Sequence, residues 1–462
     1  MISMAADFDG ASSVRLLRRS AWKKSPSRMR AQKHKKEEQV MREDGGYAIA
    51  DKVPLGKTLL YSLQHLMAFV GGGAIVPAMI MGLDPALAVF CTGIGTIIYL
   101  ICTRNRVPSY FGVSFSFITP MAVVMATDGV GGALCGIIAA GLVMVVGAGV
   151  VKAIGTGWID KVLPPVVTGC IIVVIGVGLS ATAINSVMFD GGASETFDAV
   201  GCLIGFVTFI AAVIASSWFK GFLKMIPVLI GIVVGYLVAV PFGYVDFTPV
   251  LEAAWIGLPS ITLPTWSLNG ILVIAPIALV LLVEHIGHLM TVTNLSGEDC
   301  NQYLSSSLLG NGLGIMASGA LGGPALTSIA ENIGVMGLSK CYSTRVFWWT
   351  AAFALIIGGF CPKLAMLFYS IPTCVLGGVS LMLFGLIAGN GLSLLVSEKV
   401  DFNENRNLMI VASSLIVGIG MMTTGVSVPL GSFEIPGLLL AAILSVVLNL
   451  VLPKEKEELV QC

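Results

Sequence analysis

The chain has 462 residues, of which 56% are hydrophobic and only 11% are charged, and its formal net charge at pH 7 is zero. A soluble protein normally carries about a quarter of its residues as charged side chains. This composition therefore excludes a soluble globular protein, and no nucleic-acid partner is expected. The ten cysteines stand singly without a CxxC pair, so neither a disulfide framework nor a zinc site is expected.

Residues 1–56 form a basic segment ahead of the first apolar run. The stretch from Arg15 to Lys36 is rich in Lys and Arg and holds no acid. We expect a disordered cytoplasmic tail that lies near anionic lipid. Two alternatives stay open, namely a transit peptide and a natural start at Met41.

Apolar runs near 20 residues long follow this tail to the end of the chain. A bilayer offers the backbone no hydrogen bonds, so runs of this length are predicted to be membrane-spanning helices. Transmembrane strands would instead show alternating segments of about ten residues. The sequence predicts an all-α polytopic membrane protein with 14 transmembrane spans at 57–82, 84–102, 110–126, 130–151, 162–184, 198–218, 222–243, 270–294, 303–321, 323–339, 344–361, 365–396, 407–424 and 436–453.

The positions of the basic residues predict the orientation of these spans. With the N-terminus inside, only Lys363 of the 26 Lys and Arg residues falls outside the inner segments. The positive-inside rule therefore predicts a multi-pass protein of the plasma (inner) membrane with both termini cytoplasmic. The inner segments are 1–57, 103–109, 152–161, 219–224, 295–302, 340–345, 397–406 and 454–462.

The spans divide into two repeats of seven, residues 57–245 (spans 1–7) and 270–453 (spans 8–14). The first span of each repeat carries a polar residue followed by histidine, as Gln64-His65 and Glu284-His285. An odd number of spans per repeat inverts the second copy relative to the first. Inverted repeats are typical of transporters that alternate access around a site at the midplane of the membrane.

The third span of each repeat is interrupted by small residues and proline. These segments read YFGVSFSFITP (110–120) and GGPALTSIAENIGVMG (322–337). Corresponding broken spans indicate a binding site, because freed amides and helix ends can face a substrate. The alternative is a pair of kinked packing helices.

Only two acidic residues, Glu284 and Glu331, fall deep within the predicted spans. An intramembrane charge costs several kcal/mol, so a functional role is the default expectation. Glu284 and His288 are i and i+4 and share one face of a helix. His285 points away from that face and is expected to be a packed or interhelical hydrogen-bonding residue. EHIGH does not have the HExxH spacing of a zinc hydrolase, and no other Cys or His cluster supplies a third ligand, so no metal is expected.

These motifs carry a resemblance to a known family. EHIGH in span 8, QH in span 1 and ENIGV in span 10 resemble the nucleobase–ascorbate transporter family, specifically its uracil permease branch. The similarity runs from about Pro54 to Pro453 and includes FGVSFSFITP, GTGWID, PPVVTG, IPTCVLGGVSLMLFG and SEKVDFN. It implies a core domain of spans 1–4 and 8–11, a gate domain of spans 5–7 and 12–14, and short strands in broken spans 3 and 10.

The resemblance also implies roles for individual residues. Glu284 accepts hydrogen bonds from ring N–H groups of a base, and His288 buttresses the site. Glu331 contacts the other edge of the base together with its own backbone amide and that of Ala330. The remaining implied positions are Phe115 beside the ring, Gly72 in the pocket lining, and Gln64, His65 and Asn332 as supporting residues.

The chain departs from the family pattern at three positions. Ile329 and Phe384 stand where uracil permeases have tyrosines, and Ser339 stands where the signature usually has threonine. Glu331 itself favours the pyrimidine branch, because purine-type relatives often have glutamine there.

The resulting prediction is a secondary transporter that imports a nucleobase, uracil first, by proton symport and alternating access. Uracil is neutral at pH 7, so Glu284 or Glu331 is expected to take up the proton, or His288 to relay it. Sodium is the less favoured coupling ion, and no cofactor is expected. The oligomeric state is left open, with a homodimer as one alternative.

Three rivals stay beside this prediction. The first is a xanthine or urate permease of the same family. The second is an anion exchanger or channel on the same type of fold, which two carboxylates in the site disfavour. The third is a membrane-embedded enzyme or scaffold, which would not need two matched broken spans.

Overall fold

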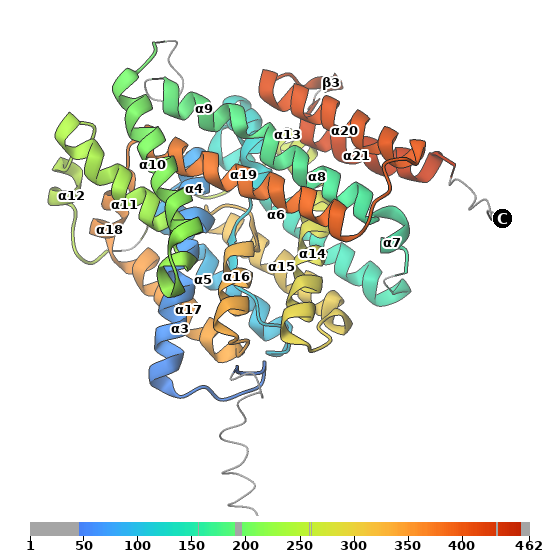
Figure 1. Ribbon diagram of the computed structural model, residues 1–462, viewed down its shortest axis with the longest axis horizontal. Helices are drawn as coiled ribbons and strands as arrows, with labels where there is room; N and C mark the ends of the chain where they lie inside the picture. The colour runs from blue at the N-terminus through green and yellow to red at the C-terminus, as the bar shows by residue number, and fades with distance from the viewer. Residues whose placement is uncertain are drawn as a thin grey trace, which may run out of the picture.

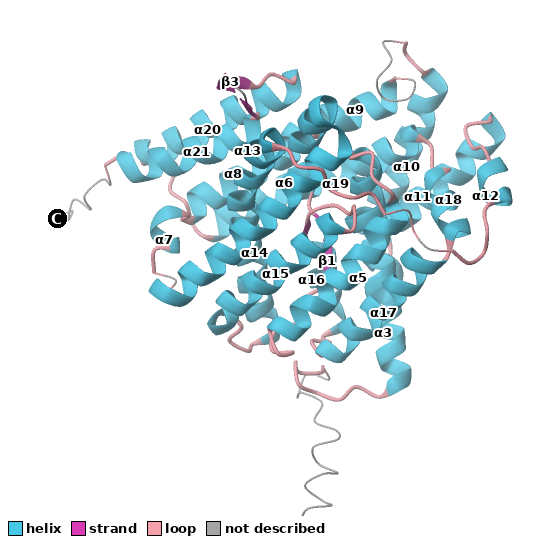
Figure 2. Ribbon diagram, turned by 180° about the vertical axis from the view of Figure 1, so that it is seen from behind, coloured by secondary structure: helices cyan, strands magenta, loops and turns pink. Residues whose placement is uncertain are grey.

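The computed structural model describes residues 46–155, 157–189, 196–257, 259, 261–430 and 433–453. Most of the described chain folds into helices, with two small two-stranded sheets (Figures 1 and 2). The prediction of an all-α membrane fold with short strands in the broken spans is confirmed. The expected N-terminal tail falls almost wholly outside the described residues.

The first repeat begins with three consecutive helical segments that replace a single straight span. The π-helix in the middle of this span contains Gly71, Gly72 and Gly73, and such insertions in a helix are frequent at functional sites. The elements of this repeat are α3 (Leu55–Phe69), η1 (Val70–Ile75), α4 (Val76–Ile80), α5 (Pro85–Cys102), β1 (Phe111–Val113), η2 (Phe115–Phe117), α6 (Ile118–Ile154), α7 (Ile159–Val162), α8 (Pro165–Gly178), α9 (Ser180–Met188), α10 (Ala199–Trp218), η4 (Gly221–Met225), α11 (Pro227–Ala239) and η5 (Val240–Phe242).

A connecting segment with the short helix α12 (Thr248–Glu252) leads to the second repeat. This repeat again starts with an interrupted span and places a strand before its third helix. Its elements are α13 (Leu268–Ile274), η6 (Ala275–Ile277), α14 (Ala278–Ser296), η7 (Asn301–Tyr303), α15 (Leu304–Ala320), β2 (Leu326–Ser328), α16 (Ala330–Ser339), α17 (Thr344–Phe360), α18 (Pro362–Tyr369), α19 (Thr373–Ser397), α20 (Asn405–Thr424), β3 (Val428–Leu430), β4 (Phe433–Ile435) and α21 (Gly437–Val451).

Most predicted spans coincide with these helices, but two boundaries differ. Helix α6 runs from the predicted span 110–126 into the predicted span 130–151, and its backbone leaves the helical conformation between them at Gly129 (φ 70°). The predicted span 365–396 is wrong at its start, because it joins two separate helices, α18 and α19. Helix α18 meets the preceding helix α17 at an angle of 84°. Proline ends a helix or opens a new one, and Pro362 and Pro372 stand at the start of α18 and just before α19.

Eight helices of the described chain are long and apolar enough to cross a membrane, or nine if α17 and α18 form one bent span. Further apolar helices, such as α11 and α21, are shorter. The protein is therefore a multi-pass membrane protein. The exact number of 14 spans stays a prediction.

The two broken spans meet at the centre of the molecule (Figure 2). Strands β1 and β2 pair antiparallel with Gly112 opposite Thr327. The backbone N–H of Ser114 extends the ladder by donating to the carbonyl of Ala325 at 3.0 Å. This pairing satisfies backbone groups that neither lipid nor a helix would satisfy.

The chain approaches itself so closely here that Gly112 has no room for a side chain. A Cβ atom at this position would lie 2.5 Å from the carbonyl oxygen of Gly73 and 2.7 Å from Cγ2 of Ile329. Gly112 therefore lets η1, β1 and the end of β2 meet without an intervening side chain.

The helices pack in two groups. In one group, α15 packs on α5 and α6, and α17 packs on α3 and α5. In the other, α19 packs on α8, α9, α10 and α11, while α20 and α21 pack on α8. In Figure 1, α20 and α21 lie at the opposite side of the molecule from α3 and α17. Contacts between the groups are fewer and involve η1, α14, α16 and α19.

Gly112→Ala is expected to destabilise the protein by about 1–3 kcal/mol, the usual cost of overpacking a tight core. Thermal unfolding of the purified protein in detergent measures this effect. Gly149→Ala is the matched control, because Gly149 is exposed and has no heavy atom within 4 Å of an added Cβ. Equal unfolding temperatures for the two variants would contradict the close approach at β1.

Candidate functional site

The candidate site lies where the two strands turn into helices. Directly after β1 the chain continues into η2, which begins at Phe115. Directly after β2, Ile329 is extended and its N–H donates to the carbonyl of Tyr110 at 3.3 Å, so that α16 begins at Ala330. The strand pairing therefore brings Phe115, Ala330 and Glu331 to the same central region from two different repeats.

The first turn of α16 supplies both donors and an acceptor. The opening N–H groups of a helix have no partner inside the helix, and no side-chain cap occupies this end. Ala330 is exposed and Glu331 is partly exposed. Backbone N–H groups and a carboxylate are thus accessible side by side.

A second carboxylate comes from α14, which packs against α16. Glu284 is partly exposed and lies near enough to Glu331 for the two charges to interact. One turn further along the same face, Nδ1 of His288 lies 2.9 Å from Oγ of Ser328 in β2. This hydrogen bond ties the histidine, and with it the carboxylate face of α14, to the strand pair.

An aromatic side chain closes another side of the site. The ring of Phe115 meets the ring of Phe384 in α19 edge to face, with 5.6 Å between the ring centroids. Gly72 also faces α19, because a Cβ atom there would lie 3.1 Å from Cδ2 of Leu383. The predicted lining residues of η1 and η2 therefore both lie against α19.

His285 has a different environment from His288. Its Nε2 lies 2.7 Å from Oγ of Ser307, and its Nδ1 lies 3.1 Å from Nδ2 of Asn311, both in α15. The same serine hydroxyl lies 2.8 Å from Oη of Tyr99 in α5. His285 is therefore an interhelical hydrogen-bonding residue, as its position on the helix predicts.

Two of the three predicted supporting residues, His65 in α3 and Asn332 in the first turn of α16, lie close together. His65 and Asn332 are buried next to each other, and the His65 ring lies 4.7 Å from that of Phe347 in α17. Their polar side-chain atoms, and Oε1 of Gln64, make no hydrogen bond of normal geometry within the described chain. Their supporting role stays a prediction.

Exposed positions continue from the site along three helices. They include Gly334 in α16, Met290 in α14, and Gly385 and Gly389 in α19. Each of these helices runs from the site towards one of the segments 295–302, 340–345 and 397–406, which the charge pattern predicts to be cytoplasmic.

Sequence reasoning missed several polar partners of the site. Ser328 holds His288, and Tyr99, Ser307 and Asn311 hold His285. Hydroxyl side chains are frequent within apolar spans, where they commonly bond to their own helix. Their sequence positions therefore carry no signal that would single them out.

The fold and this site together define a membrane permease, because two broken spans bring carboxylates, helix-end amides and an aromatic ring together between helices of both repeats. Residues 56–426 match the sequence pattern of the permease family. The chain belongs to that family, the nucleobase–ascorbate transporters, and it is a permease and not an enzyme.

Curated relatives and solved structures agree with this assignment. The chain is 41% identical over 408 residues to the uracil permease of Bacillus subtilis (strain 168), covering 86% of this chain and 93% of that protein. It is 37% identical over 406 residues to the uracil permease of Escherichia coli (strain K12), covering 87% and 93%. The transmembrane domain of a cyanobacterium bicarbonate transporter, BicA, superposes with a TM-score of 0.59 at 16% identity, covering 87% of this chain and 99% of that one, which shows a shared fold.

Ser307→Ala is expected to lower the free energy of unfolding by about 1–3 kcal/mol, because it removes the hydrogen-bond partner of Nε2 of His285 and of Oη of Tyr99. Thermal unfolding measures the loss. The matched control is Ser306→Ala, since the Ser306 hydroxyl bonds only to the Tyr303 carbonyl one turn earlier. A Ser307→Ala variant as stable as the Ser306→Ala variant would show that the network contributes nothing.

Proposed function

We propose that this permease imports uracil by proton symport. One observation carries the proposal: Glu284 and Glu331 face one site together with the N-terminal turn of α16 and the ring of Phe115. Uracil is a flat ring with N–H donors and carbonyl acceptors. Carboxylates accept from the ring N–H groups, the helix-end amides donate to the carbonyls, and Phe115 covers the apolar face of the ring.

The names of the curated relatives support uracil as the substrate, because the proteins that this chain matches over most of its length are uracil permeases. Glu331 supports a pyrimidine substrate, since a carboxylate can only accept hydrogen bonds and the uracil ring carries N–H donors. Phe384 and Ile329 are buried beside this site and bring no hydroxyl group to it. The pocket is therefore less polar on this side than in relatives with tyrosines there.

An anion substrate is the rival that the fold suggests, because the bicarbonate transporter BicA shares the architecture. The site argues against it. Two carboxylates repel an anion, and in the part of the chain that the structure describes no Lys or Arg lies deep within a membrane-spanning helix. A second permease candidate, for xanthine or urate, shares the family but is disfavoured by Glu331.

Proton coupling follows from the same carboxylates. A neutral base brings no positive charge to compensate Glu284 and Glu331, and removal from water disfavours a carboxylate charge. Uptake of a proton together with the base neutralises one of the two carboxylates. His288, one turn from Glu284, is placed to relay this proton. Each proton carried inward releases about 2.3 kcal/mol per 100 mV, which corresponds to roughly fortyfold accumulation from the potential alone.

The two packing groups of helices support alternating access. We assign α3–α6 and α13–α17 to a core domain (spans 1–4 and 8–11) and α8–α11 and α19–α21 to a gate domain (spans 5–7 and 12–14). The site residues lie on the core side, and Phe384, Leu383 and α11 face them from the gate side. Movement of one group past the other would expose the site to each side in turn.

The charge distribution supports a plasma (inner) membrane location with both termini cytoplasmic. A homodimer stays a prediction.

Wild-type protein in sodium-free liposomes should accumulate labelled uracil when an inward pH gradient is imposed. Glu284→Gln should abolish this accumulation, because an amide presents donors where the base needs an acceptor, at a cost of about 1–3 kcal/mol for the unpaired group. Accumulation that ignores the pH gradient and an uncoupler, yet follows a sodium gradient, would refute proton symport.

The control for Glu284→Gln is Glu252→Gln, because Glu252 is exposed in α12 and remote from the strand pair. Both variants should elute as folded protein in gel filtration. Near-normal uptake by Glu284→Gln would remove this carboxylate from the site.

Competition against labelled uracil tests the substrate class. Uracil analogues with both ring N–H groups should compete strongly, and xanthine should compete weakly, because Glu331 favours a pyrimidine. Better competition by xanthine than by unlabelled uracil would assign the protein to the purine branch.

A further inference from the structure

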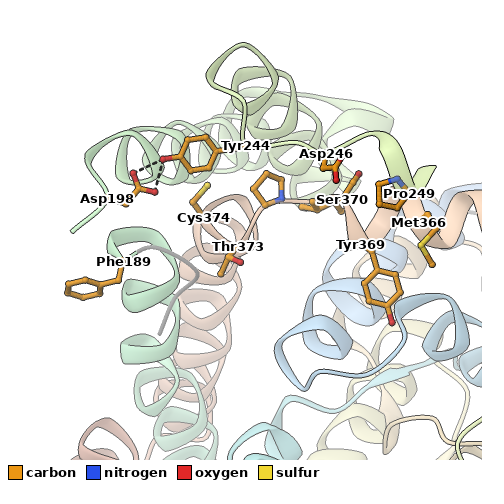
Figure 3. A pocket seen from close by; sticks show the side chains of 12 residues that line it. Phe189, Asp198, Tyr244, Asp246, Pro249, Met366, Tyr369, Ser370, Thr373 and Cys374 are labelled. Atoms are coloured by element: carbon orange, nitrogen blue, oxygen red, sulfur yellow. Dashed lines mark hydrogen bonds between the residues drawn. The ribbon is translucent and has the colours of Figure 1, made fainter. Parts of the chain in front are cut away.

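A cavity of about 380 Å³ lies away from the central site, at the N-terminal end of α19 (Figure 3). Its wall comes from the α9–α10 region (Phe189, Asp198), the connection to α12 (Tyr244, Asp246), α18 (Tyr369) and the start of α19 (Thr373, Cys374). On the proposed orientation this end of α19 is extracellular. None of the residues assigned to the central site contributes to this wall.

The cavity carries two carboxylates. Asp198 accepts hydrogen bonds from Oη of Tyr244, at 2.6 and 2.7 Å to its two oxygens, and from the N–H of Gly201 at 2.9 Å. Although burial acts to raise the pKa of Asp198, these hydrogen bonds lower it. The N–H of Thr248, which donates to Asp246 at 2.9 Å, lowers the pKa of that exposed carboxyl. Both groups are therefore ionised acceptors at neutral pH.

The same cavity also offers donors and aromatic surface. The N–H groups of Thr373 and Cys374 belong to the first turn of α19, a helix of 25 residues whose N-cap is Pro372 and makes no side-chain cap. The Tyr369 ring is about half exposed and lines the opposite wall, as Figure 3 shows. Acceptors, donors and a flat apolar face thus surround one space.

This combination selects the kind of ligand. The two carboxylates repel an anion. Both oxygens of Asp198 already accept from Tyr244, so Asp246 is the acceptor proposed for a ligand, while the first-turn N–H groups of α19 are the donors. A neutral, flat molecule with both N–H and C=O groups satisfies all of these elements. The central site uses the same pattern, with the N-terminus of α16 in place of that of α19.

We propose that this cavity is an outer docking site for the pyrimidine, filled from the extracellular side before the central site opens outward. The proposal rests on uracil being the substrate. The cavity lies between α18, which follows core helix α17, and gate helix α19. A base docked there stands at the junction that must part when the transporter faces outward.

Protection of an introduced thiol tests the docking site. Thr373→Cys places an exposed thiol in the wall, and a membrane-impermeant methanethiosulfonate applied outside should modify it. External uracil should slow this modification at least severalfold, also when Glu284→Gln has disabled the central site. Leu263→Cys is the control, because Leu263 is 70% exposed and lies outside the cavity wall, and uracil should leave its modification rate unchanged.

Three outcomes overturn the proposal: no modification of the Thr373→Cys thiol from outside, no protection by uracil, or protection that disappears with Glu284→Gln. The last result would mean that uracil acts from the central site through a change of conformation. If wild-type liposomes accumulate no uracil at all, the proposed function fails instead, so the two failures are distinguishable.

A transport measurement tests the stacking of the base on Tyr369 independently. Tyr369→Leu should raise the half-saturating external uracil concentration about tenfold, equivalent to about 1.4 kcal/mol, with little change in maximal rate. Tyr369→Phe should leave the half-saturating concentration at the wild-type value, because it keeps the aromatic ring. A Tyr369→Leu variant with unchanged half-saturation would contradict stacking on this ring.

Discussion

The pairing of β1 with β2 is the constraint on which the rest of the structure depends. Strands are costly inside a membrane, because each unpaired N–H or C=O group lacks water to bond. Here each short strand supplies hydrogen-bond partners to the backbone groups of the other, with Gly112 opposite Thr327. The pairing in turn frees the helix ends that follow, so that α16 starts at Ala330 with its amides directed out of the helix.

The acidic groups of the site depend on the same pairing. Ser328, the last residue of β2, hydrogen-bonds His288 and so orients the face of α14 that carries Glu284. Glu331 follows three residues later on α16. Two carboxylates from different helices are thereby held close together within the membrane, where a charged side chain is energetically unfavourable. In the proposed mechanism, a ligand with N–H groups and a proton relieve that cost.

Much of this arrangement could be predicted from the sequence, because the membrane restricts what an apolar run can do. The lengths of the runs predict helices, and the small residues around Gly112 and Pro324 mark the broken spans. Glu284 and Glu331 stand out because acids are rare there. The sequence prediction joins α18 and α19 in one span, 365–396, because mostly apolar residues continue on both sides of Pro372. The partners of His285 could not be found, because which helices meet depends on packing between residues far apart in the chain.

The central claim is that the carboxylate pair takes up a proton when a neutral base binds. Calorimetric titration of purified protein with uracil near neutral pH, in two buffers of different ionisation enthalpy, measures this directly. The account predicts that about one proton is taken up from the buffer for each uracil bound. Tight binding of uracil with no proton uptake anywhere between about pH 6 and 8 would contradict it.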